Sequence, residues 1–153
     1  LPSIVGAKIG QPNAPVVGFA GDGAFGIAVN ELTAIGRDEW PAVTQIVFRN
    51  YQWGAEKRNS TLWFDDNFVG TELDTKVSYA GIAQACGLQG LQVKTMDELT
   101  AVLNQAIKDQ MENNKTTLIE VILNQELGEP FRRDAMKKPV QVAGVAAADM
   151  AAD

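Results

Sequence analysis

Four short apolar segments, separated by helical patterns, constrain the fold of this chain more than any other feature. Residues 15–20, 43–48, 91–93 and 117–123 are rich in Val, Ile, Leu and Phe. Such runs are typical of strands that are buried on both faces of a parallel sheet. Because helical patterns alternate with them, the sequence predicts an α/β fold that is doubly wound around a mainly parallel sheet, with helices on both faces.

The segments between the predicted strands differ in their regularity. Helices are predicted over residues 25–37, over residues 78–86 and after a capping box formed by Thr95 and Glu98. The stretch over residues 50–75 loses the pattern and mixes aromatic with polar residues, which predicts a long functional loop.

The two ends of the chain suggest its place in a larger protein. Residues 1–10 resemble a helix already under way, without an initiator Met, so we expect the chain to be a piece of a longer protein. We expect residues 1–123 to form one α/β domain of that protein and residues 124–153 to form a C-terminal tail.

Composition excludes several classes of function. The chain has 153 residues, 13 basic and 19 acidic, and its net charge of −6 disfavours non-specific nucleic-acid binding. It contains no histidine, which removes Ser-His-Asp hydrolysis and His-ligated zinc from within the chain. A single cysteine excludes an internal disulfide framework, and no apolar run is long enough to cross a membrane. We therefore expect a cytoplasmic protein that binds neither nucleic acid nor membranes.

A glycine-rich motif follows the first predicted strand, and one interpretation of it is a dinucleotide site. Residues 21–26, GDGAFG, fit the G-x-G-x-x-G pattern. However, Asp22 would place a carboxylate where the pyrophosphate lies, and the acidic residue expected about 20 positions later is absent. A bound cation removes the first objection, so the sequence favours a metal site over a dinucleotide site.

Two oxygen-bearing side chains are expected at one edge of the sheet. Asp22 follows the first strand and Asn50 follows the second, and parallel strands bring their carboxyl ends to the same edge. Mg²⁺ prefers oxygen ligands and often takes the remainder from substrate phosphates. Asp22, Asn50 and a backbone carbonyl of the following turn could hold Mg²⁺ and, through it, a diphosphate.

The spacing of this motif resembles the signature of a known superfamily. Gly-Asp-Gly, followed after 26 residues by Asn, is similar to the thiamine-diphosphate signature of acetolactate synthases and pyruvate decarboxylases. The resemblance implies that Asp22, Asn50 and the carbonyl of Gln52 hold Mg²⁺. Residues 49–57, 68–73 and 126–135 look like the sulfoacetaldehyde acetyltransferase family and, more narrowly, its C-terminal diphosphate-binding domain.

That resemblance implies an activity, two cofactors and partners. The family converts sulfoacetaldehyde and phosphate to acetyl phosphate and sulfite in taurine breakdown, with thiamine diphosphate and Mg²⁺. It implies that the activating glutamate lies in another domain, and that the enzyme forms a homo-oligomer, a dimer or a tetramer. The residues implied to bind the cofactor are Gly21, Asp22, Gly23, Ala24, Phe25, Asn50, Gln52, Trp53 and Gly54.

Some alternatives stay open at this point. The chain could belong to an acetolactate synthase or a sulfopyruvate decarboxylase-like enzyme, or it could be a non-catalytic assembly domain of the same fold. Trp53 could line the cofactor pocket or simply pack in the protein, and residues 56–58 could form a solvated charged stretch or an anion-binding loop. Arg132 and Arg133 could contact the substrate sulfonate or phosphate, because guanidinium groups match such oxyanions.

Overall fold

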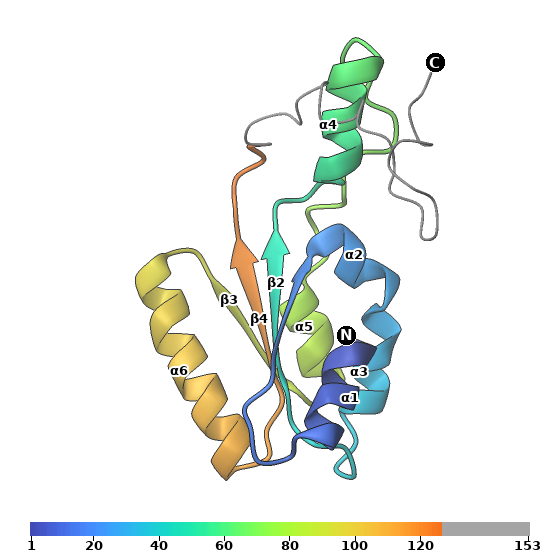
Figure 1. Cartoon of the computed structure of the whole chain (residues 1–153). Helices are drawn as coiled ribbons and strands as arrows, with labels where there is room; N and C mark the ends of the chain where they lie inside the picture. Colours follow the sequence, from blue (N-terminus) through green and yellow to red (C-terminus); the bar gives the residue numbers. More distant parts are fainter. Residues whose placement is uncertain (127–153) are drawn as a thin grey trace, which may run out of the picture. The chain divides into compact units, whose positions relative to one another are not determined.

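The computed structural model describes residues 1–126 (Figure 1). The described residues fall into two compact units. The first unit comprises Leu1–Trp53 and Glu72–Glu126 and contains the whole sheet. The described part of the second unit is Gly54–Thr71.

The first unit is built on a four-stranded sheet in which every neighbouring pair is parallel. The strand order is β1-β2-β4-β3, so the two central strands are β2 and β4. The strands are β1 (Val17–Gly21), β2 (Thr44–Arg49), β3 (Gln89–Val93) and β4 (Thr117–Ile122). The parallel α/β prediction is confirmed, and all four predicted strands are present with bounds shifted by a few residues.

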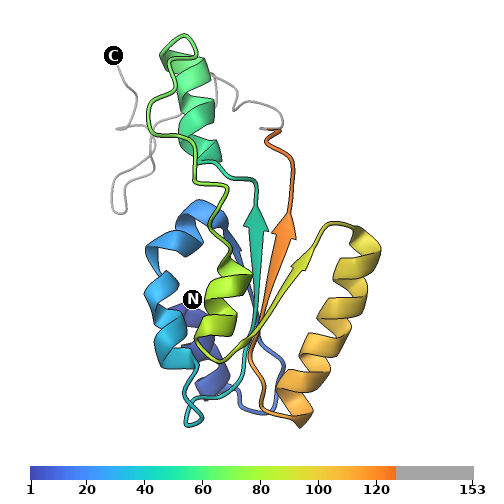
Figure 2. The same cartoon turned by 180° about the vertical axis from the view of Figure 1, so that it is seen from behind.

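Helices cover both faces of this sheet, as Figures 1 and 2 show. On one face, Ile46 and Ile119 pack against α6 (Met96–Glu112). Their neighbours Val47 and Leu118 point to the opposite face, where they form a core with residues of α2 (Asp22–Ile27), α3 (Leu32–Ile35) and α5 (Tyr79–Ala85). The two-residue alternation of strands therefore divides the core into two layers. The N-terminal helix α1 (Pro2–Gly10) packs through Val5 against Ile35 of α3 and against Val43, which immediately precedes β2.

The ends of α5 and α6 follow local sequence signals. Gly87 adopts φ +82° after α5, and the Leu88 N–H donates to the Ala83 carbonyl, which is the pattern of a Schellman motif. The predicted capping box of α6 is confirmed, with Thr95 and Glu98 each accepting from the other's backbone N–H. No helix among residues 1–126 is both long and apolar enough to span a bilayer.

The single helix predicted over residues 25–37 is wrong, because this segment forms three short helices. The backbone leaves helical geometry at Ala28, between α2 and the 3₁₀ turn η1 (Val29–Glu31), which α3 then follows. Gly26, Val29 and Asn30 have low helix propensity, which explains why the apolar pattern continues while the helix is interrupted.

The long loop predicted over residues 50–75 is also partly wrong, because α4 (Gly54–Trp63) lies within it. No residue of α4 is buried, so the helix has no apolar stripe that periodicity could reveal. Its sequence is nevertheless rich in good helix formers, including Ala55, Glu56 and Lys57. Lys57 lies over the ring of Phe68 within the same unit, with the ammonium nitrogen 5.3 Å from the ring centroid.

The contact between α5 and β3 gives a testable prediction about stability. A β-carbon at Gly90 would overlap the backbone carbonyl oxygen of Ala80, and backbone atoms cannot yield as a flexible side chain can. Gly90→Ala should therefore lower the free energy of unfolding by about 3 kcal/mol. Gly6→Ala is the matched control, because Gly6 lies inside α1 with open space around it and should gain about 0.5 kcal/mol. Equal denaturant midpoints for the two variants would contradict this account of the contact.

Candidate metal centre

The candidate metal ligands meet at the carboxyl ends of β1 and β2. The strand pairing places Gly21 opposite Phe48, so Asp22 and Asn50 leave neighbouring strands at the same sheet edge. The backbone N–H of Tyr51 donates to Asp22 Oδ2 at 2.7 Å, which joins the two strand ends directly. The structure thus brings together the two segments that the motif spacing predicted to be neighbours.

The carboxylate of Asp22 is buried, with 2% of its surface exposed, and its two oxygens differ in their surroundings. Oδ2 accepts from the Tyr51 N–H and from Arg49 Nη1, at 2.7 and 3.3 Å. Oδ1 accepts only from the adjacent Gly23 N–H, at 3.0 Å, among the described residues. Because each carboxylate oxygen has two acceptor positions, Oδ1 keeps one for a further ligand.

The turn after β2 has an unusual backbone geometry. Tyr51 has φ +61°, in the left-handed region that a bulky residue rarely adopts. Two contacts hold it there, namely its N–H donated to Asp22 and its ring stacked on Arg49, whose guanidinium carbon is 4.4 Å from the ring centroid. Such backbone strain is typical of functional sites, where the surrounding structure maintains it.

Arg49 is the buried cation of this region, with 1% of its surface exposed. Besides Asp22, its Nη2 donates to the carbonyls of Asp74 and Val77, at 2.7 and 3.0 Å. Its guanidinium carbon also lies 4.9 Å from the ring centroid of Tyr79. Arg49 therefore connects the end of β2 to the start of α2 and to the segment that precedes α5.

Glu120 carries the matching negative charge in the middle of β4. It is fully buried, and its Oε1 lies 3.5 Å from Arg49 Nε. The N–H groups of Tyr79 and Ala80 and the hydroxyl of Ser78 donate to its carboxylate at 3.1 to 3.2 Å. A buried carboxylate needs such donors, and their position at the start of α5 also favours a negative charge.

Tyr79 links α5 to the first residue of α2. Its hydroxyl donates to the backbone carbonyl of Asp22 at 3.0 Å. Burial raises the pKa of the Tyr79 phenol, and the nearby negative charges of Asp22 and Glu120 act in the same direction, while Arg49 opposes them. The phenol therefore remains a proton donor at neutral pH and holds the start of α2 in place.

The remaining residues of the predicted ligand set, Asn50 and Gln52, flank Tyr51, whose N–H donates to Asp22. Asn50 is half-buried, and its side-chain amide forms no hydrogen bond within residues 1–126. Gln52 is buried, with its amide donating to the Gln125 carbonyl at 2.9 Å. No group of three His, Cys, Asp or Glu residues among the described positions could hold a metal. A cation at this edge would therefore depend on one carboxylate together with amide and carbonyl oxygens.

The other predicted cofactor residues fall in different surroundings. Gly21 and Ala24 are exposed at the start of α2, whereas the ring of Phe25 belongs to the core and meets Tyr79 edge-on. A β-carbon at Gly23 would lie 2.8 Å from the ring of Trp53, so Trp53 packs directly on this glycine. Gly54 is the first residue of α4, in the second unit. The predicted anion contacts, Arg132 and Arg133, lie outside the described residues.

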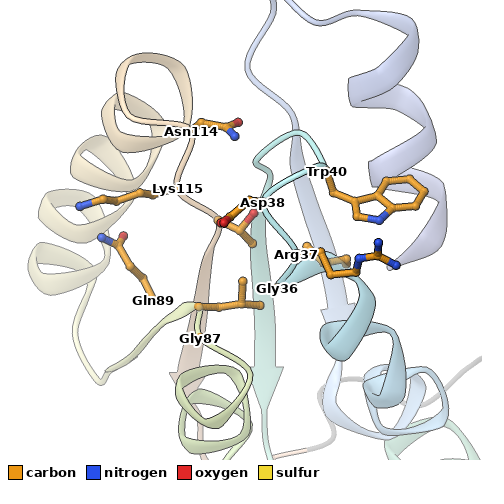
Figure 3. A pocket seen from close by; sticks show the side chains of 11 residues that line it. Gly36, Arg37, Asp38, Trp40, Gly87, Gln89, Asn114 and Lys115 are labelled. Atoms are coloured by element: carbon orange, nitrogen blue, oxygen red, sulfur yellow. The ribbon is translucent and has the colours of Figure 1, made fainter.

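A separate pocket lies at the opposite ends of the strands. Figure 3 shows it between Trp40 and Arg37, which precede β2, and Lys115, which precedes β4. Its volume is about 280 Å³. Ligands of open α/β sheets bind outside the carboxyl ends of the strands, so this pocket at the amino ends is not the candidate site.

Sequence reasoning missed the roles of Arg49, Glu120 and Tyr79. A signal was present for one of them, because Glu120 interrupts the apolar run over residues 117–123. A glutamate in a strand buried on both faces requires a buried partner. Arg49, at the end of the neighbouring buried strand, was a candidate for that partner.

Comparison with known proteins decides the family. Residues 1–121 match the model of the thiamine pyrophosphate enzyme, C-terminal TPP binding domain. The chain belongs to this family of TPP-binding domains. TPP, thiamine pyrophosphate, is another name for thiamine diphosphate.

Two individual enzymes show which members of the family the chain resembles. Sulfoacetaldehyde acetyltransferase of Roseovarius nubinhibens is 79% identical over 150 residues, covering 98% of this chain and 25% of the relative. Acetolactate synthase isozyme 2 large subunit of Escherichia coli is 30% identical over 104 residues, covering 68% of this chain and 19% of the relative. The chain thus spans about a quarter of the length of this sulfoacetaldehyde acetyltransferase.

A solved structure gives the same fold. The thiamine diphosphate-dependent 4-hydroxybenzoylformate decarboxylase of Rhodococcus jostii RHA1 aligns with a TM-score of 0.71 at 26% sequence identity. The alignment covers 84% of this chain and 23% of that chain. The doubly wound α/β prediction is therefore confirmed by an independent comparison.

Proposed function

We propose that this chain holds the diphosphate of thiamine diphosphate through Mg²⁺ at the carboxyl edge of β1 and β2. The ligands would be the Asp22 carboxylate, the Asn50 amide oxygen and the Gln52 carbonyl. The main support is the Asp22 carboxylate, which is fixed through Oδ2 while Oδ1 keeps an acceptor position open. The donor set also fits, because Mg²⁺ prefers oxygen ligands and keeps places for phosphate oxygens and water.

The chain's own residues would bind and orient the cofactor. When bound, thiamine diphosphate supplies the nucleophilic carbon of the reaction, and the protein supplies orientation and electrostatics. Gly21, Gly23 and Ala24 would lie beside the diphosphate, since they flank Asp22 in the chain. Trp53, stacked on Gly23, would fix the turn that carries Gln52. Residues 1–123 would act together as this cofactor domain, with residues 124–153 as a tail.

For the complete enzyme we propose sulfoacetaldehyde acetyltransferase activity. It would convert sulfoacetaldehyde and phosphate to acetyl phosphate and sulfite. The similarity to the Roseovarius enzyme over 98% of this chain supports this activity over that of acetolactate synthase, because the Escherichia coli acetolactate synthase subunit is only 30% identical to this chain. The test is an assay of the full-length enzyme with thiamine diphosphate and Mg²⁺, following acetyl phosphate and sulfite.

The same assay separates the alternative functions. Pyruvate as the only substrate tests for acetolactate synthase, and sulfopyruvate tests for a decarboxylase. Acetolactate from pyruvate, without acetyl phosphate from sulfoacetaldehyde, would contradict the proposal. Absence of turnover with all three substrates, in an enzyme that folds and binds the cofactor, would favour an assembly domain.

The proposal also covers the compartment, the pathway and the oligomeric state of the complete enzyme. We place the complete protein in the cytoplasm, in taurine breakdown, as a homo-oligomer that is a dimer or a tetramer. The single cysteine suits a reducing compartment, and the family resemblance provides the pathway and the assembly.

Arg132 and Arg133 give a prediction about substrate binding. The chain's net charge of −6 would repel a sulfonate and a phosphate unless cationic groups gather near them. Replacing one of these arginines by Ala in the full-length enzyme should raise the KM for one anion about 10- to 150-fold, which corresponds to a lost charge-assisted contact. The affinity for thiamine diphosphate should stay unchanged. Steady-state kinetics check this, and wild-type KM values for both anions in both variants would contradict it.

A further inference from the structure

We propose that Arg49 is a positioning residue for Asp22 and that Glu120 neutralises it, so that Asp22 keeps its full charge for the cation. This inference rests on the proposed magnesium site. It deepens that proposal, because neither Arg49 nor Glu120 belongs to the ligand set. Arg49 would set the orientation of the Asp22 carboxylate, and Glu120 would set the electrostatic potential around it.

The first step is that Arg49 fixes the orientation of Asp22. Its Nη1 donates to Asp22 Oδ2 at 3.3 Å, and its Nη2 donates to the carbonyls of Asp74 and Val77. Two tyrosine rings lie against the guanidinium, with its central carbon 4.4 and 4.9 Å from their centroids. With 1% of its surface exposed, Arg49 has no room to swing away. The position of Asp22 Oδ2 is therefore set, and with it the direction in which Oδ1 points.

The second step is that the positive charge of Arg49 lies close to the proposed cation site and works against cation binding. A guanidinium 3.3 Å from a carboxylate attracts it, but it also repels any cation that the same carboxylate binds. Asp22 and Arg49 are almost completely buried, so solvent ions screen this repulsion poorly. An Arg49 without a counter-charge would cancel the field of Asp22 at the metal.

The third step is that Glu120 provides the counter-charge. Its Oε1 lies 3.5 Å from Arg49 Nε, on a different nitrogen from the one that contacts Asp22. The carboxylate cannot rotate freely, because donors at the start of α5 and the amide of Gln92 bind it. Asp22, Arg49 and Glu120 together carry one net formal negative charge. That is the charge of Asp22 alone.

A purely structural role is the competing explanation. Arg49 and Glu120 tie together β2, β4 and the start of α5, so their removal is expected to destabilise the protein whatever their effect on the metal. The experiment must therefore measure Mg²⁺ affinity and stability independently. Gln110 offers a matched control, because it is equally buried but binds Val16 and Thr44 at the other ends of β1 and β2.

The test is a cycle of variants in the full-length enzyme, with the Mg²⁺ dissociation constant measured calorimetrically in the presence of thiamine diphosphate. Glu120→Gln should raise this constant about 10- to 100-fold. Arg49→Met/Glu120→Gln should bind Mg²⁺ more tightly than Glu120→Gln, because it restores the net charge, but more weakly than wild type, because Asp22 loses the guanidinium that orients it. A wild-type constant in the double variant would contradict the positioning role of Arg49. Gln110→Leu should lower the melting temperature of the cofactor-free protein and leave the constant unchanged.

Three further results would overturn the proposal. Glu120→Gln with wild-type Mg²⁺ affinity would do so, and so would a double variant that binds Mg²⁺ no more tightly than Glu120→Gln. If Glu120→Gln does not fold, Arg49→Met and the double variant differ only in the charge of Glu120. We then expect the double variant to bind Mg²⁺ about tenfold more weakly, and equal affinities would overturn the proposal. Asp22→Asn tests the proposed magnesium site separately from the roles of Arg49 and Glu120. Unchanged Mg²⁺ affinity in that variant would show that Asp22 is not a metal ligand and would refute the site itself.

Discussion

Replacing Asp22 by Ala in the full-length enzyme is expected to raise the dissociation constant for thiamine diphosphate, at saturating Mg²⁺, by about 100-fold or more. The proposed site has one carboxylate, so the variant loses its only charged ligand. The diphosphate would then lose its link to the protein through the cation. Calorimetric titration with thiamine diphosphate and Mg²⁺ measures the effect.

Asn50→Ala should weaken cofactor binding in the same way but to a smaller extent. Asn50 would contribute a neutral oxygen, so its loss should weaken cofactor binding about tenfold, less than the loss of Asp22. Melting temperatures of the cofactor-free variants control for unfolding, which is needed because Asp22 also accepts from Tyr51 and Arg49. Cofactor affinity that is unchanged in Asp22→Ala would refute the assignment of the metal ligands.

The 153-residue chain by itself is expected to form no acetyl phosphate from sulfoacetaldehyde and phosphate. We expect the glutamate that activates the cofactor to lie in another domain, as the family resemblance implies, and the chain spans about a quarter of the length of the Roseovarius enzyme. The chain would supply the diphosphate side of the site and bind thiamine diphosphate weakly. An assay of the purified chain, with the full-length enzyme as the positive control, measures this. Turnover by the chain alone would show that its own residues activate the cofactor.

Much of the fold could be predicted because its strands are continuous apolar runs. The run over residues 117–123 forms β4, one of the two central strands, and the capping box at Thr95 marks the start of α6. The prediction failed where burial gives no periodic signal. Helix α4 has no buried residue, and the break at Ala28 depends on backbone geometry rather than on the apolar pattern.

Some residues of the candidate site could likewise be predicted from the sequence, and others could not. Asp22 and Asn50 could be placed at one edge because parallel strands align their carboxyl ends, and the structure joins the two segments through Tyr51. The sequence indicated that Glu120 needs a buried partner, but it did not single out Arg49, since the two residues are 71 positions apart and meet only through the β2–β4 pairing. The left-handed turn at Tyr51 also leaves no trace in composition or spacing.

The most direct test of the proposed site is a crystal structure of the full-length enzyme with thiamine diphosphate and Mg²⁺ bound. We expect a magnesium ion about 2.0–2.1 Å from an Asp22 carboxylate oxygen, the Asn50 amide oxygen and the Gln52 carbonyl, with diphosphate oxygens completing its shell. A bound diphosphate whose metal is held by other residues, with the Asp22 carboxylate still accepting only from Gly23, Arg49 and Tyr51, would contradict the proposed site.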